Sequence, residues 1–177
     1  MKISNFACWL LGGWIAGSLF MILVATQNFR SVDRLLASPA GAAASIERMG
    51  REEARTFLRY QVSEQNRWYF ETWEKIQLAL GLALLALTLR QDRMSAALAA
   101  GMFVLLLAQR FWITPEIVRI GRLIDFSPQA PERPTFWIFH GAYSAVELTK
   151  LALGFFLSGR LIVGKTYIGR AAEESPR

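Results

Sequence analysis

The chain has 177 residues, of which 53% are hydrophobic, and its mean hydropathy is positive. This length allows one domain, and the composition argues against an ordinary soluble protein. The net charge is +6, but the arginines gather at the ends of apolar stretches, so anionic lipid headgroups are the expected partner and nucleic acid is not. The single cysteine, Cys8, excludes an intrachain disulfide and a cysteine-based metal cluster within one chain.

Four stretches approach the length of about 20 apolar residues that a helix needs to cross a bilayer. They are residues 6–26, 68–89, 94–113 and 136–163. The first is expected to stay as an anchor, because its apolar run is longer than a signal peptide's and no small-residue cleavage site ends it. The sequence therefore predicts an all-α fold, in which residues 1–177 form a single membrane domain built as a four-helix bundle.

An even number of crossings puts both termini on one side of the membrane. Lys2, the short turn at residues 90–93 and the basic tail from Arg160 would share that side, and the positive-inside rule makes it cytoplasmic. The long loop on the other side also carries arginines, but long loops count least in this rule. The predicted location is the cell inner membrane, with several crossings and both termini in the cytoplasm.

Residues 38–67 lie between the first two spans and carry nearly equal numbers of acidic and basic side chains. Their apolar residues recur at helical spacing, which predicts an amphipathic helical arm outside the membrane. The arm would either dock a partner or lie against the membrane face and pack on its own bundle. Aromatic side chains near the span ends are expected to anchor the interface, and these are Trp68, Tyr69, Trp73, Trp112 and Trp137.

The third span is followed by Thr114-Pro115-Glu116, a strong signal for the start of a helix. A short interfacial helix is expected over residues 115–124, and Thr135 is expected to cap the last span. Small residues at four-residue spacing, such as Gly13 and Gly17, indicate close packing between helix backbones within the bundle.

The last span carries ionisable groups within its apolar run. At 100° per residue, His140, Tyr143, Ser144 and Glu147 share one face of the helix, with Lys150 just beside it. A charge at the centre of a bilayer costs at least about 2.5–3.5 kcal/mol, so this face should turn inward. Glu147 and Lys150 are three residues apart and are expected to form an ion pair.

The predicted topology brings four charged or titratable side chains to one depth in the membrane, and these are Glu71, Glu74, Arg110 and His140, with Gln27 and Asn28 nearby. A structural salt-bridge network around Arg110 is the simplest interpretation. The alternatives are a proton or ion pathway, and a divalent metal site made by His140, Glu71 and Glu74. One histidine cannot supply both axial ligands of a bis-histidine haem, and no cofactor is predicted.

The sequence contains no glycine-rich phosphate loop, no serine–histidine–aspartate set and no cysteine motif, so an enzyme is not expected. The leading hypothesis is a non-catalytic accessory or scaffolding subunit of a larger membrane assembly. Its partners would be the lipid bilayer and other membrane proteins, or further copies of the chain. The alternative is a small transporter or channel that uses the polar face of the last span.

Two segments, AQRFWITPEIVRIGR and FWIFHGAYSAVELTKL, resemble the closing half of the transmembrane-protein-205-like family, also called domain of unknown function 4149. In that family a proline-bearing exit from the third span precedes a phenylalanine-rich start and a His-Gly pair in the fourth. The matching positions are Pro115, Phe136, His140, Gly141 and Ser144. The long charged loop and the Glu147–Lys150 pair depart from the pattern. The resemblance implies a four-helix membrane protein with no agreed biochemical activity.

Overall fold

A computed structural model describes residues 3–37, 43–127 and 129–173, and this part of the chain is helical with no strand. The long helices are α1 (Ile3–Ala37), α3 (Arg51–Thr88), α4 (Arg93–Ala108) and α6 (Arg133–Glu173). A short helix, α2 (Ala43–Met49), precedes α3. Helix α4 continues through a π-helical segment, η1 (Gln109–Ile113), into α5 (Thr114–Ile124). The predicted all-α fold class is therefore confirmed.

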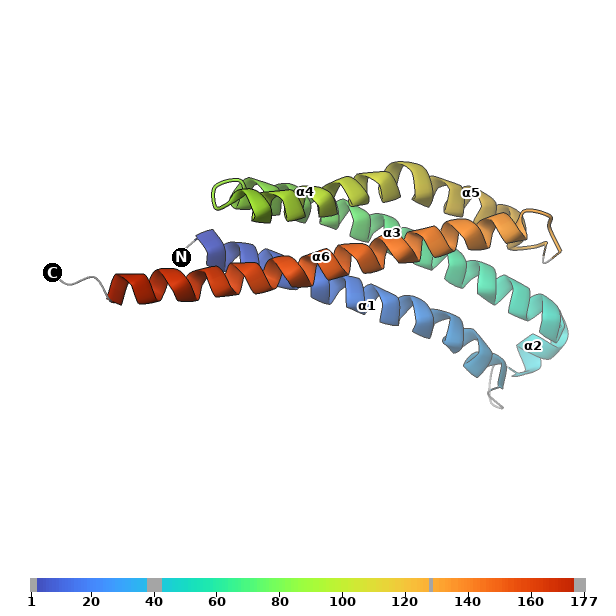
Figure 1. The fold of residues 1–177 in the computed structure, drawn as a ribbon. Coiled ribbons are helices and arrows are strands. Elements are labelled where there is room, and N and C mark those ends of the chain that lie inside the picture. Colours follow the sequence, from blue (N-terminus) through green and yellow to red (C-terminus); the bar gives the residue numbers. More distant parts are fainter. Residues whose placement is uncertain (1–2, 38–42, 128, 174–177) are drawn as a thin grey trace.

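The long helices lie lengthwise against one another, and successive ones run in opposite directions (Figure 1). Helix α1 contacts α3 and α6, and α4 contacts the same two helices. The four segments therefore surround a common interior. The start of α1, the α3–α4 turn and the end of α6 lie towards one end of the molecule, while α2 and the end of α5 lie at the other (Figure 1).

The larger apolar core fills the half of the interior nearest the start of α1. It contains side chains from all four long helices, and its members are Ala7, Leu11, Trp14, Leu84, Ala99, Met102, Leu106, Leu157 and Leu161. Interiors of this kind are held by close contacts between many atoms, each of which contributes little alone.

A second, smaller core joins the far ends of α1 and α3. Val32 and Leu36 from α1 pack with Ala54 from α3, and partly buried Ile46, Leu58 and Val62 surround them. The predicted arm, whose residues 38–42 lie outside the described part, is helical over residues 43–49 and 51–67, but it is continuous with the second predicted span. Helix α1 does not end near residue 26, and α3 runs unbroken through residue 67. The reason is local: α3 contains no proline, and its first glycine is Gly81.

The helix predicted over residues 115–124 is present as α5, but it continues directly from α4 and η1 and is not a separate element. The chain remains helical from Arg93 to Ile124, because the wider π turn over residues 109–113 accommodates a proline that an α-helical turn would exclude. The hydroxyl of Thr114 does not cap this helix, and donates instead to the carboxylate of Glu74. Helix α6 also begins at Arg133, so Thr135 lies inside it.

Within the described part of the chain, two helical stretches, Ser4–Ala37 and Arg93–Ile124, are long and apolar enough to cross a membrane. Many large apolar side chains also lie on the outside of the molecule, including Trp9, Phe20, Leu23, Val104, Ile138 and Leu148. Exposed apolar surface on this scale is typical of membrane or protein contact. Membrane association is therefore indicated, although on length and composition alone.

Candidate functional site

The predicted ion pair between Glu147 and Lys150 is formed on the inner face of α6. The Lys150 Nζ atom lies 2.7 Å from Glu147 Oε2, and the lysine side chain has no exposed surface. Residues three apart on an α-helix are neighbours on its surface, so a single helix can supply both charges. The pair lies inside the molecule, where each charge needs further polar partners.

Three other segments supply those partners. Ser18 Oγ of α1 and Gln77 Nε2 of α3 donate to Glu147 Oε1 over 2.8 and 3.1 Å. Gln109 Nε2 of η1 donates to Glu147 Oε2 over 3.2 Å. Lys150 Nζ in turn donates to Gln77 Oε1 over 2.8 Å. The Glu147 carboxylate therefore accepts hydrogen bonds from α1, α3 and η1, and it forms an ion pair with a lysine of its own helix, α6.

The polar cluster ends abruptly on the side of the larger core. Lys150 Nζ lies 5.9 Å from the centre of the Trp14 ring, a cation–π distance. One turn beyond Lys150, Gly154 faces Leu11, Ile15 and Met102. One turn beyond Gln77, Gly81 faces Phe103 and Trp14. An apolar layer therefore separates the cluster from the end of the molecule that holds the start of α1.

A second carboxylate, Glu74, lies on α3 one turn before Gln77 and has no exposed surface. Its Oε1 atom accepts a hydrogen bond from Thr114 Oγ1 of α5. Its Oε2 atom lies 3.7 Å from Arg110 Nε, which is too far for a hydrogen bond. No donor among the described residues reaches Glu74 Oε2 or the neighbouring Gln109 Oε1.

The π-helical segment η1 makes this arrangement possible. A π turn holds one more residue than an α turn, so it changes the face on which the following side chains lie. Gln109 is wholly buried and contacts Glu147, while the next residue, Arg110, reaches Glu74. Thr114, just past the segment, also points at Glu74. Local π turns of this kind are frequent at functional sites.

A groove of about 380 Å³ lies beside Glu74, between α1, α3, α5 and α6. Its apolar lining residues are Ala25, Phe29, Phe70, Ile117, Val118, Phe136 and Trp137, and its polar ones are Thr26, Ser63, Asn66, Arg67, Thr114, His140 and Tyr143. Thr114 donates to Glu74, and the Tyr143 phenol interacts with Glu74 and Gln109. These two hydroxyls therefore stand between the groove and the buried carboxylate.

His140 lies in this groove and does not join the charged cluster as predicted. Its ring stacks on Phe136 with centroids 5.8 Å apart, and meets Trp137 edge-on at 5.6 Å. His140 does share a helix face with Glu147, but the groove lies over that face at this end and leaves the histidine exposed. Ser144 is also exposed, and its hydroxyl donates to the His140 carbonyl of its own helix.

The metal site suggested by the sequence is not formed in the described part of the chain, where no three His, Cys, Asp or Glu side chains come together. Glu71 is half-buried and acts electrostatically on Arg122. The other two polar residues expected nearby lie elsewhere: Asn28 donates to Asn66 over 2.7 Å, and exposed Gln27 accepts from Arg34. Of the predicted set, Glu74, Arg110, Tyr143, Glu147 and Lys150 come together.

The structure also adds Ser18, Gln77 and Gln109, which the sequence interpretation missed. Each interrupts an apolar run, as in EKIQLALGL and VLLLAQRF, and that interruption was the available signal. Of the predicted interface anchors, Trp68, Trp112 and Trp137 are 56–71% exposed, and Tyr69 is half-buried. Trp73 is different, because its ring packs against Gly17 of α1 and its Nε1 atom is buried.

A separate ionic network ties α3 to α5 on the arm side of the groove. Glu64 binds Arg67 and Arg122 over 2.6 and 2.9 Å, and Arg67 also binds Asp125 over 2.7 Å. The hydrogen bond from Arg122, with that from Arg67, holds the pKa of Glu64 below its usual value against the effect of burial. The network fixes the end of α5 on the arm.

The sequence matches no protein-family model, and no curated protein or solved structure is significantly similar to it. The resemblance to the transmembrane-protein-205-like family therefore stays a prediction, and the interpretation of the site rests on its geometry.

Proposed function

We propose that this chain is a non-catalytic integral membrane protein that serves as an accessory or scaffolding subunit of a larger membrane assembly. Its four long helical segments would form a membrane bundle, with both termini on the cytoplasmic face of the cell inner membrane. Lipid, other membrane proteins or further copies of the chain would cover its apolar exterior.

The observation that carries this proposal is the saturated network around Glu147. A buried charge pair whose partners come from every neighbouring helix fixes one arrangement of those helices, because any slip would leave a charge unpaired in an apolar interior. Such a site is suited to keeping the helices of a scaffold in one arrangement. The arm adds a second surface, since the small core that it shares with the end of α1 packs it against that helix.

The groove beside Glu74 favours the second candidate, a small transporter or channel. A line of polar groups runs from the groove through Thr114 and Gln109 to Lys150. That line ends at the apolar layer of Trp14 and Met102, so a path across the molecule is interrupted in this conformation. The scaffold is therefore preferred. Ion or proton flux in liposomes containing the purified chain would favour the transporter.

The experiment that tests the scaffold is co-purification in mild detergent with arm variants. Met49 and Phe57 lie on the arm and are 49% and 54% exposed. We expect the double variant Met49→Ser/Phe57→Ser to fold and to lose partner proteins that accompany the wild type. A matched control is Leu123→Ser, which changes a side chain 50% exposed on α5 outside the arm. The proposal fails if the wild type carries no constant partner, or if the control loses the same proteins.

A further inference from the structure

The two buried carboxylates of the interior have very different surroundings. Glu147 accepts hydrogen bonds from Ser18, Gln77 and Gln109 and is paired with Lys150 at 2.7 Å. Glu74 has one hydrogen bond, from Thr114, and its cationic neighbour Arg110 stands 3.7 Å away. A carboxylate keeps its charge in an apolar interior when donors surround it, and takes a proton when they do not. When the environments of two carboxyl groups differ in this way, one of them can hold a proton while the other stays ionised.

The unsatisfied atoms indicate where a proton would reside. Glu74 Oε2 and Gln109 Oε1 are both buried acceptors without a donor from the described residues. A proton on Glu74 Oε2 turns one unsatisfied acceptor into a donor, and so supplies the hydrogen that this corner of the cluster lacks.

The groove provides the route for that proton. Thr114 and Tyr143 line the groove, and Thr114 donates to Glu74 Oε1 from its inner wall. On the far side of the cluster, the apolar layer next to Trp14 closes the way. The groove therefore offers a route by which a proton can reach Glu74.

The other charges around Glu74 come from two segments. Arg110 of η1 and Lys150 of α6 favour its ionised form, and Glu147 of α6 opposes it. The hydroxyl from α5 is that of Thr114, and α1 contributes Ser18, which is already bound to Glu147. The ionisable groups that line the groove are Arg67, His140 and Tyr143, and the titration of His140 has to be distinguished from that of Glu74.

We propose that Glu74 is a reversible proton-binding site served from the groove, while Glu147 remains ionised. In the binding step a hydronium ion in the groove gives its proton to Glu74 Oε2, an O–H bond forms there, and water remains in the groove. The step needs no oxidant, metal or second substrate. The site does not depend on the accessory role, since a protein without partners would still titrate at Glu74.

Infrared difference spectroscopy of the full chain in lipid nanodiscs tests this site, with spectra recorded against pH. We expect a buried carboxylic-acid C=O band that appears on acidification, and that is absent from Glu74→Gln. The band should persist in the double variant Glu147→Gln/Lys150→Met, and its midpoint should not move in His140→Asn. Thr114→Val removes a hydrogen bond to the ionised form, so the midpoint should rise by about one to two pH units.

Glutamine has the shape of a protonated glutamate, so Glu74→Gln is expected to fold, and circular dichroism checks this. If it does not accumulate, the Thr114→Val shift decides the question alone. An unmoved midpoint in Thr114→Val overturns the proposal. The proposal is also overturned if the wild type shows no such band at any pH at which it stays folded. A band that persists in Glu74→Gln but is absent from Glu147→Gln/Lys150→Met overturns it as well.

Discussion

Lys150 is a wholly buried lysine, and its environment shows what a charge requires inside an apolar molecule. Its ammonium group has the Glu147 carboxylate, the Gln77 amide oxygen and the face of Trp14 around it. Coulomb attraction alone seldom offsets the loss of water around two buried ions, so the hydrogen bonds from the neighbouring helices are essential to the pair. The pair therefore contributes to specificity of packing more than to stability.

This account predicts an asymmetry between single and double substitutions. Lys150→Met leaves the Glu147 carboxylate buried and unpaired, and should lower the free energy of unfolding by about 3–5 kcal/mol. The double change Glu147→Gln/Lys150→Met removes both charges and should recover much of that loss. Thermal unfolding in detergent, followed by circular dichroism, measures both. Equal losses in the two variants would contradict the account.

The sequence could predict this pair because the spacing of residues within one helix determines their common face. It could not predict Ser18, Gln77 or Gln109 as partners, since periodicity gives the buried face of each helix but not which residues of different helices meet. The predicted position of His140 was wrong for a related reason. It shares the face of Glu147, but the groove leaves that face open at its level.

At the level of elements, the contact between α1 and α3 depends on a glycine that faces an aromatic ring. A Cβ atom on Gly17 would lie 2.1 Å from Cη2 of Trp73, so the indole ring would have to shift. By contrast, a Cβ atom on Gly13, one turn earlier in α1, meets nothing within 4 Å. The four-residue spacing of these glycines does not give them equal roles.

The two positions form a matched pair of substitutions. Gly17→Ala should displace Trp73 and destabilise the protein by about 1–3 kcal/mol. Gly13→Ala adds the same methyl group in open space and should be neutral, or stabilise α1 by up to about 1 kcal/mol through helix propensity. Denaturation of both variants in the same detergent decides the matter. A loss at Gly13 as large as at Gly17 would mean that helix α1 packs differently.

The presence of the helices could be predicted from the sequence, but the residues at which they begin and end could not. Apolar runs of about 20 residues indicated the membrane-length portions, and the polar sequence of residues 51–67 suggested a separate arm. Helix α3 continues through this change in polarity. Residues 51–67 contain no proline or glycine, and side chains of α1 pack against them. The π turn at residues 109–113 was also missed, since Thr114-Pro115 has the usual signature of a helix start.

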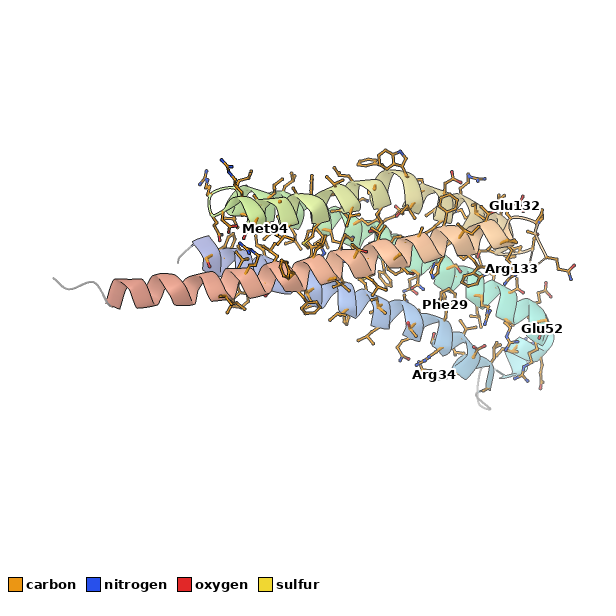
Figure 2. The ribbon with its side chains drawn as sticks, in the orientation of Figure 1. Phe29, Arg34, Glu52, Met94, Glu132 and Arg133 are labelled. Carbon is orange, nitrogen blue, oxygen red and sulfur yellow. The ribbon has the colours of Figure 1, made fainter. Side chains whose placement is uncertain are left out.

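For the molecule as a whole, the length of α3 sets the scale. Its 38 residues extend roughly 57 Å at about 1.5 Å each, nearly twice the hydrocarbon thickness of about 30 Å. The excess lies at the arm end, where Arg34 and Glu52 stand at the same end of the molecule as Glu132 and Arg133, opposite Met94 (Figure 2). A membrane around the bundle would leave this end projecting as a rigid structure.

The proposed topology makes a prediction for the two ends. The turn at Gln91 should face the cytoplasm, and the loop at Ser127 should face the opposite side, because α4 and α5 run as one continuous helical stretch between them. Reporter fusions or cysteine labelling at the two positions measure this. The native Cys8 is replaced by serine in the labelling experiment. Labelling of both positions from one side would exclude the four-crossing arrangement.

The position of the charge pair within a single helix also bears on biosynthesis. Helix α6 is synthesised after α1, α3 and η1, and it carries both members of the pair, three residues apart. The two charges can therefore neutralise each other before α6 meets any other segment. The side chains that then complete the site, Ser18, Gln77 and Gln109, belong to segments synthesised earlier. The order of translation thus delivers the charged helix after the segments that supply its donors and acceptor.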